Sequence, residues 1–394
     1  MPVATLHALA RPLDDAAALG RAFDTLFGPE PPVLLGLGEP THGIEAFPLL
    51  RNELLAHLVH RGYRSVVLET DVLAAAAVDA YVTGGEGEID TVLTTGFSHG
   101  FGAVPGNRAL VSWLREHNAD RAPEDRVRFH GFDGPVEYAG APSPRRSLRA
   151  VHDHLPRALR PRSARELDVL LGEDADWANE RAMYDPAASI GGSDRARALR
   201  VVADDLASAL RRAAPALRPV DPEAHDLAAT HARTALGLLR YHAAMAEDGP
   251  DRIGTLLGVR AEMMAGNLLA IVARERSRGP SLVFAHNAHL HRSPGTSWGN
   301  AGALIAPTLG EGYVVVATDA NPRAVPGTLQ GALAEATTRR ALFPTPALRA
   351  ALPPSIGAGD PIVPGHLPLD PADLACSDAV VFVADTDGTR RQYW

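Results

Sequence analysis

The chain has 394 residues, 46% of them apolar, and its 38 basic residues against 47 acidic ones give a net charge of −9. All 38 basic residues are arginine, which excludes mechanisms that need a Schiff-base lysine, a P-loop lysine or a kinase-type lysine. The acidic balance argues against nucleic-acid binding, because the phosphates would be repelled.

The N-terminal sequence indicates a protein that is not exported. Residues 1–15 lack the basic start and apolar run of a signal peptide. No stretch of the chain approaches the ~18 uninterrupted apolar residues of a membrane span. We therefore expect a cytoplasmic protein without a membrane partner. The single cysteine, Cys376, excludes a disulfide framework and agrees with a reducing compartment.

The first 71 residues predict a β-α-β unit. An apolar run at 31–38 between prolines and a Gly-Glu-Pro segment is typical of a buried strand. Apolar residues at helical spacing follow over 45–61, and a second apolar run occupies 65–71. We expect the two strands to be parallel and their crossover to be right-handed.

The rest of the chain predicts further strands around a helical insertion. Strand patterns lie at 126–134, 281–289, 312–319 and 379–387. Residues 143–279 are rich in arginine and alanine and show helical spacing. We therefore predict an α/β fold with a largely parallel central sheet flanked by helices. Its catalytic domain would be discontinuous, residues 1–142 and 280–394, and helices at 143–279 would form one wall of a cleft.

A glycine-rich segment, residues 83–106, separates two expected helices. It contains seven glycines, which predict either a mobile loop over the cleft or an irregular connection.

Ionisable residues follow four of the predicted strands. In an open parallel sheet the carboxyl ends of the strands border the ligand crevice, so these side chains should converge. They are Glu39, Thr41 and His42 after the first strand; Glu69 and Asp71 after the second; His130 and Asp133 after the third; and His286, Asn287, His289 and His291 after the fourth.

This set of side chains indicates hydrolytic chemistry without a covalent nucleophile. A carboxylate beside an imidazole fixes its tautomer and raises its basicity, so that it can take a proton from water. The sequence has no G-x-S-x-G elbow, and Cys376 has no histidine near it in sequence. Arg51, on the helix after His42, could hold a carboxylate or an oxyanion.

A metal site is the competing hypothesis. Glu39, His42, Glu69, His286 and His289 offer ligands that suit zinc, iron or manganese, although no HExxH motif is present. A metal- or haem-dependent oxidoreductase, or a binding protein, therefore stays open as an alternative.

Two segments of the sequence closely resemble motifs of the erythromycin esterase family. LLGLGEPTHGIEAFPLLRNELLAHLVHRGYRSVVLETD (34–71) is similar to its opening motif, and FAHNAHLHR (284–292) to its His-Asn-x-His motif. Weaker similarity at 111–118, 128–134 and 259–272 follows in the family's order.

The resemblance implies an α/β core in which histidine-activated water attacks a lactone or ester carbonyl without a metal or other cofactor. By this resemblance His42 is the general base, oriented by Glu39 and Glu69, with His289 as the alternative base. His286 and His289 would polarise the substrate carbonyl, and Arg51 would hold the carboxylates. We expect the substrate to contact the surrounding side chains Thr41, Phe97, His99, Phe101, Asp133 and Asn287.

Two departures from the family pattern concern the substrate. The stretch before Trp113 is glycine-rich where the family has tryptophans, and Arg260 is followed by Ala261 where the family has aspartate. The expected partner is therefore a small-molecule ester or lactone, a macrolide or another natural product. A biosynthetic acyl transfer or cyclisation at the same site is an equal alternative, and the sequence gives no indication of the oligomeric state.

Overall fold

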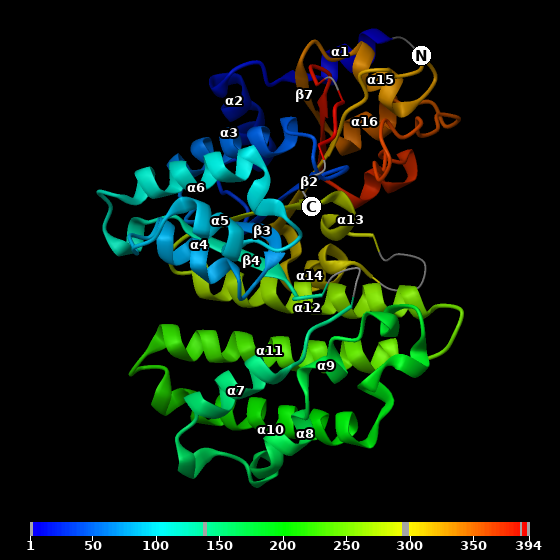
Figure 1. Cartoon of the computed structure of the whole chain (residues 1–394). Helices are drawn as coiled ribbons and strands as arrows, with labels where there is room; N and C mark the ends of the chain where they lie inside the picture. Colours follow the sequence, from blue (N-terminus) through cyan, green and yellow to red (C-terminus); the bar gives the residue numbers. More distant parts are fainter. Residues whose placement is uncertain (1–2, 137–139, 294–298, 387, 392–394) are drawn as a thin grey trace.

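The structure is a computed structural model that describes residues 3–136, 140–293, 299–386 and 388–391. One eight-stranded sheet runs through its centre (Figure 1). In spatial order the strands are β1 (Arg11–Pro12), β7 (Arg340–Pro344), β8 (Ala379–Val383), β6 (Tyr313–Asp319), β2 (Leu34–Glu39), β5 (Ser281–His286), β3 (Ser65–Asp71) and β4 (Arg128–Asp133).

The sheet is mixed. The six strands from β8 to β4 are paired in parallel, whereas β7 runs antiparallel to both β8 and β1. The prediction of an α/β fold is confirmed, but that of a largely parallel sheet is wrong. β7 and its neighbour β1 were missed because β1 has two residues and β7 only three apolar ones, too few to show a pattern.

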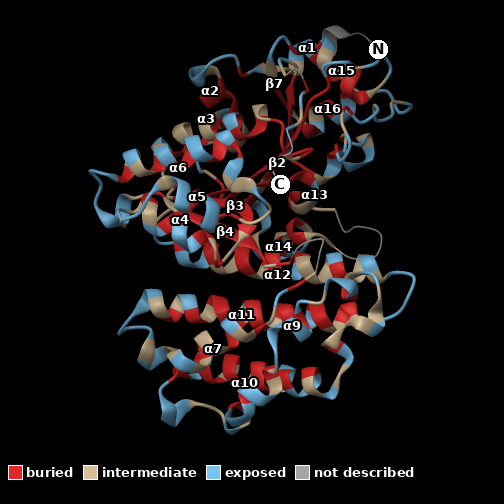
Figure 2. Ribbon diagram, viewed as in Figure 1, coloured by how far each residue is buried: buried red, intermediate tan, exposed pale blue. Residues whose placement is uncertain are grey.

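Helices cover both faces of the sheet. On one face, Leu35 and Leu37 of β2 join a core with the helices of the N-terminal third; on the other, Leu34 packs with the last helix before β5 and a helix after it. The first group is α2 (Ala16–Phe27), α3 (Ala46–His60), α4 (Ala75–Val82), α5 (Ile89–Gly96) and α6 (Pro105–Asn118), and the second is α12 (Arg252–Glu275) and α14 (Ala301–Leu309). Burial on both faces explains the unbroken apolar strands (Figure 2).

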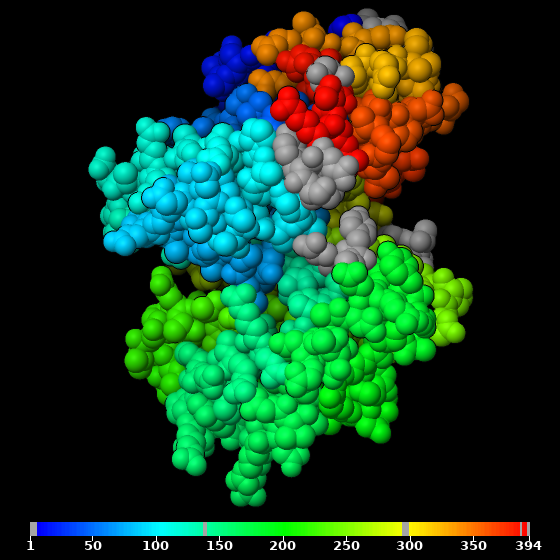
Figure 3. Space-filling view, viewed as in Figure 1, coloured from blue at the N-terminus to red at the C-terminus, as the bar shows by residue number. Residues whose placement is uncertain are grey.

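The chain between β4 and β5 is helical, as predicted. Its helices α7 (Arg145–His154), α8 (Leu167–Leu171), α10 (Asp194–Leu217) and α11 (Pro222–Met245) have an apolar core of their own. α11 also packs along α12, which lies against β4. In Figure 3 these green helices lie below the part that contains the sheet. That residues 143–279 form a separate domain stays a prediction.

The remaining helices are short. α1 (Val3–Leu9), α15 (Leu329–Glu335) and α16 (Thr345–Ala351) pack beside β7 and β8, α9 (Asp174–Trp177) belongs to the helical region, and α13 (Asn287–Leu290) directly follows β5.

The predicted strands are found with boundaries that differ by a few residues. The segment predicted as a strand at 281–289 ends at His286, and its last residues form α13, so His289 is on a helical turn. The strand predicted at 379–387 ends at Val383, and residue 387 lies outside the described residues.

The glycine-rich segment 83–106 is more ordered than the sequence suggested. It contains α5 and a 3-10 turn, Phe101–Ala103. A Cβ at Gly102 would lie 1.9 Å from the carbonyl oxygen of Leu93, and one at Gly106 would lie 2.6 Å from Pro48 Cβ. These two glycines therefore allow close packing, and glycines in this segment are not by themselves a sign of mobility.

One described helix, α12, is long and apolar enough to span a membrane by length and composition alone. Its packing against β4, α11 and α14 accounts for that composition equally well, since the core helix of a globular fold passes the same test.

Candidate active site

The order of the strands brings three of the predicted segments together. β5 lies between β2 and β3, so the carboxyl ends of these strands are adjacent. Glu39 ends β2 opposite His286 of β5, and Glu69 is near the end of β3. The ionisable residues after these strands meet at this edge because the order of the sheet departs from the order of the chain here.

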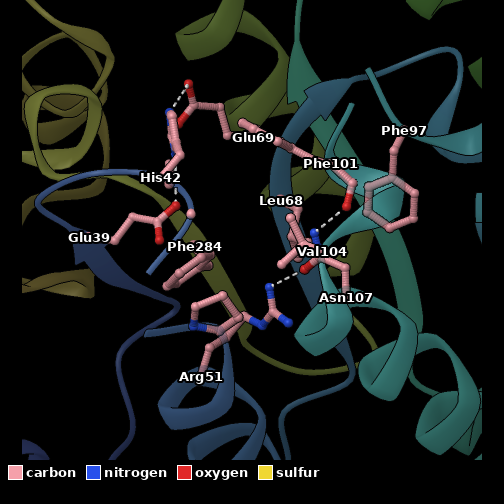
Figure 4. A pocket seen from close by; sticks show the side chains of 13 residues that line it. Glu39, His42, Arg51, Leu68, Glu69, Phe97, Phe101, Val104, Asn107 and Phe284 are labelled. Carbon is pink, nitrogen blue, oxygen red and sulfur yellow. Dashed lines mark hydrogen bonds and ion pairs between the residues drawn. The ribbon is translucent and has the colours of Figure 1, made fainter. Parts of the chain in front are cut away.

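His42 lies between two carboxylates (Figure 4). Its Nδ1 is 2.8 Å from Glu39 Oε1, and its Nε2 is 3.8 Å from Glu69 Oε1. Because an ionised carboxylate only accepts hydrogen bonds, the contact with Glu39 places the imidazole proton on Nδ1. Nε2 is then the basic nitrogen. The His42 side chain keeps 24% of its surface exposed, so the imidazole is open to solvent on part of its surface.

Glu69 is held by three further groups. His289 Nε2 lies 3.1 Å and Arg260 Nη2 3.2 Å from its Oε1, and the backbone N–H of His286 donates to its Oε2 at 2.8 Å. Arg260 also contacts Asp133, with Nη2 to Oδ2 at 2.5 Å and Nε to Oδ1 at 3.1 Å. The side chain of Glu69 is 5% exposed, and these partners compensate its burial.

His286 is engaged on both ring nitrogens. Its Nε2 is 3.0 Å from the carbonyl oxygen of Pro40, which can only accept, and its Nδ1 accepts from the N–H of Ala288 at 3.1 Å. The ring is therefore the neutral Nε2–H tautomer. Burial lowers the pKa of His286 to about 3. Its contacts tie β5 to the segment after β2.

The electrostatics of the site favour ionised Glu69 and a basic His42. Burial alone would raise the pKa of Glu69, but His289, His42 and Arg260 hold it well below its usual range. Burial alone would lower the pKa of His42, yet Glu69 and Glu39 outweigh that effect and raise it. Burial raises the pKa of Glu39, and Glu39 Oε2 is buried without a hydrogen-bond partner among the described residues.

Arg51 was expected to hold the carboxylates. It is fully buried, and its described hydrogen bonds go to amide and carbonyl oxygens instead. Nη1 donates to Asn107 Oδ1 at 2.7 Å and Nη2 to the carbonyl oxygen of Gly106 at 3.1 Å. Its guanidinium also lies 4.9 Å from the ring centroid of Phe284. Asn107 in turn donates to the carbonyl oxygen of Phe101, so Arg51 fastens the segment that carries Phe101 (Figure 4).

The predicted substrate-binding residues fall into two groups. In the first group, the ring centroid of Phe101 lies 4.9 Å from that of His42 and 5.5 Å from that of His99. Phe97 and Phe101 both line the pocket beside His42. His99 adopts a positive φ of 57° and approaches Asp133 at 3.9 Å.

Thr41 and Asn287 are in the second group, which is buried. The Thr41 hydroxyl contacts the carbonyl oxygen of His42. The Asn287 amide exchanges hydrogen bonds with the backbone N–H and carbonyl of Thr318 and so joins β5 to β6.

Sequence reasoning missed Arg260 and Asn107 as site residues. Arg260 is on α12, far from the strand ends in sequence, and only the weak family similarity at 259–272 pointed to it. His130, expected at a strand end, lies within β4 and faces Glu275 of α12 at 3.0 Å. It is therefore away from the site.

The pocket beside His42 is small, about 30 Å³, which is room for roughly two water molecules. Glu39, His42, Arg51, Glu69 and Phe101 are among its lining residues. Across the described ranges of the chain, no group of three or more His, Cys, Asp or Glu side chains could hold a metal ion.

Three solved structures are similar over nearly the whole chain. A Bacillus cereus protein gives a TM-score of 0.72 at 18% identity, covering 97% of this chain and 96% of that one. A mutant of the erythromycin esterase EreC in its open conformation gives 0.69 at 19% identity, covering 98% of each chain. A succinoglycan biosynthesis protein gives 0.64 at 17% identity, covering 98% and 96%. At these identities the likeness concerns the fold.

The family comparison is more specific. The family model described as erythromycin esterase matches residues 58–344, more than half of the chain. This range includes Glu69, Arg260, His286 and His289 but begins after His42. No curated protein matches the sequence.

Proposed function

Because this chain belongs to the erythromycin esterase family, and is a hydrolase of that kind, we propose that it cleaves a carboxylic ester or lactone by water that His42 activates. The observation that carries the proposal is the position of His42, with Nδ1 on Glu39, Nε2 facing Glu69 and 24% of the side chain exposed. Each carboxylate raises the basicity of the imidazole, which is what proton abstraction from water needs near neutral pH.

In the proposed reaction His42 Nε2 takes a proton from water as the oxygen attacks the carbonyl carbon. The carbonyl oxygen becomes an oxyanion, for which His289 and Arg260 are the nearest donors, with 19% and 16% of their side chains exposed. When the tetrahedral intermediate collapses, protonated His42 returns the proton to the leaving alkoxide. The products are a carboxylic acid and an alcohol.

The proposal gives Glu69 and His286 supporting roles. Glu69 keeps His289 and Arg260 beside the reacting carbonyl, and the backbone N–H of His286 fixes the Glu69 carboxylate. Arg51 positions Phe101 over His42 through Asn107. We propose no cofactor for this reaction.

The small size of the pocket bears on the substrate. A space of about 30 Å³ suits the attacking water, so the substrate body would bind on the exposed side of His42 and His289, near Phe101 and His99. The similar erythromycin esterase supports a macrolide lactone as one candidate, and other natural-product esters or lactones stay candidates beside it.

The test is hydrolysis of a panel of macrolides, smaller lactones and simple esters by the wild type and two variants. His42→Ala should lower kcat by roughly 10² to 10⁴, the usual contribution of a general base. His60→Ala, an exposed histidine at the end of α3, is the matched control and should leave kcat unchanged. Full activity of His42→Ala on a substrate that the wild type hydrolyses would contradict the assignment.

Acyl transfer is the second candidate, because a histidine placed between two carboxylates could take a proton from an alcohol as well as from water. The same base would then deprotonate an acceptor hydroxyl. Mass spectrometry of the products in the presence of added alcohols separates the two reactions, because transfer gives a new ester and hydrolysis gives the free acid.

A further inference from the structure

A second and larger cavity lies away from the candidate active site. It has a volume of about 320 Å³, against about 30 Å³ for the pocket at His42, and the two share no lining residue. It lies between α11 and α12, which run side by side in Figure 1, and reaches Leu304 of α14. A volume of this order holds a small organic ligand.

Small residues keep this space open. At Gly237 of α11 an added Cβ would come within 2.5 Å of Met263, so the glycine lets Met263 of α12 pack against the helix backbone. At Gly266, one turn further along α12, an added Cβ would meet nothing within 4 Å. The gap between the helices is therefore real at Gly266, and a larger side chain there would fill it.

The polar groups of the cavity are only partly satisfied. Arg233 donates to Asn267 Oδ1 at 3.3 Å and to Thr230 Oγ1 at 3.0 Å, and no described carboxylate lies within salt-bridge distance of it. Thr234 is 2% exposed, and its hydroxyl has no hydrogen-bond partner among the described residues. Arg233 is half-buried without a described counter-charge and the buried Thr234 hydroxyl lacks a partner, so a ligand that supplied both would stabilise the site.

Charge and shape together define the ligand. Burial and the nearby Arg274 lower the pKa of Arg233 to about 10. A bound anion would therefore stabilise the charged form of its guanidinium. A guanidinium matches a planar carboxylate, which can also accept from the Thr234 hydroxyl. The remaining walls are apolar and come from Leu236, Gly237, Met263, Ala265, Gly266 and Leu304.

We propose that this cavity binds a small amphipathic monocarboxylate. Its carboxylate would pair with Arg233 and Thr234, and its apolar body would lie along Met263 and Gly266. The Arg240–Glu262 ion pair, 2.8 Å, already neutralises the other charges of the lining and leaves Arg233 as the cation for the ligand.

The test is isothermal titration calorimetry with octanoate as the probe and inorganic phosphate as the comparison anion. Wild-type protein should bind octanoate, and Gly266→Leu and Arg233→Gln should each weaken binding about tenfold or more. Gly249→Leu is the matched control, because a Cβ at Gly249, in the connection between the same two helices, also meets nothing within 4 Å. It should bind octanoate as the wild type does.

Thermal unfolding of each variant checks that it is folded, and Gly266→Ala replaces Gly266→Leu if the larger side chain prevents folding. The proposal is overturned if octanoate fails to bind the wild type at millimolar concentration or binds Gly266→Leu and Arg233→Gln unchanged, as it would at the active site alone. Phosphate binding as strong as that of octanoate would also overturn it, since the apolar walls would then contribute nothing.

Discussion

At the scale of single residues, the two histidines of the His-Asn-x-His segment make different contacts. His286 uses both ring nitrogens on backbone groups, whereas His289 lies on the exposed side of Glu69. The sequence resemblance let both polarise the carbonyl and left His289 as the alternative base, because a motif gives the residue type and spacing but not the hydrogen-bond partners. Their different contacts are the basis for the different roles proposed above.

The pH dependence of the reaction follows from the raised pKa of His42. The base must be unprotonated, so kcat/KM should fall as the pH drops through a value above the ordinary 6.5 of histidine. Glu39→Gln removes one of the charges that raise this pKa, and the acid limb should then move to lower pH while the maximal rate decreases. A pH profile of both proteins measures the shift, and an acid limb that stays in place would contradict the role of Glu39.

Arg260 is the residue whose loss should affect stability most directly. Asp133 is fully buried and pairs with Arg260, so Arg260→Gln leaves that carboxylate without its main counter-charge. We expect a loss of about 3 kcal/mol in the free energy of unfolding, measured by urea denaturation. Arg218→Gln, which breaks the exposed pair with Asp226, is the control and should lose less than about 1 kcal/mol.

At the scale of elements, the glycines of β2 show how a motif can be structural. A Cβ at Gly38 would lie 2.0 Å from Asn287 Oδ1, whereas at Gly36 the nearest atoms are at 3.4 Å. Gly38 therefore leaves room for the amide that joins β5 to β6 and precedes His289.

The comparison of these two glycines is a test within one strand. Gly38→Ala should displace Asn287, lower the free energy of unfolding by about 1–3 kcal/mol and reduce kcat, because α13 carries His289. Gly36→Ala should leave kcat unchanged. Denaturation and steady-state kinetics on both variants check this, and equal effects at the two positions would show that the Asn287 contact is unimportant.

Much of the fold was readable at the level of elements. The six parallel strands are buried on both faces, so their apolar runs stood out, and the ionisable residues Glu39, Glu69 and His286 lie together at the carboxyl ends of three of them. The antiparallel direction of β7 could not be predicted from the sequence, because it depends on pairing with β8 rather than on the pattern of β7 itself. The glycines of 83–106 allowed more than one interpretation, because close packing and loop flexibility both use glycine.

At the scale of the whole molecule, α12 connects the parts that the sequence treated separately. It supplies Arg260 to the candidate active site, Glu275 to His130 and Gly266 to the second cavity. None of these contacts could be derived from strand-end reasoning, because they depend on how the helical region packs on the sheet.

The absence of a cofactor from the proposed reaction is tested on the whole protein. Hydrolysis should be unchanged by a chelator, and elemental analysis of the purified protein should find no stoichiometric metal. Loss of activity on chelation, restored by one added metal ion, would favour the metal-dependent alternative instead.

The lysine-free composition gives this protein a practical advantage in labelling chemistry. Activated esters commonly acylate side-chain amines, and here no side chain offers one. Mass spectrometry of the intact protein after turnover of a reactive ester would therefore show little of this background. An acyl group found on an internal peptide would reveal a covalent intermediate, and its absence during fast turnover would support direct attack by water.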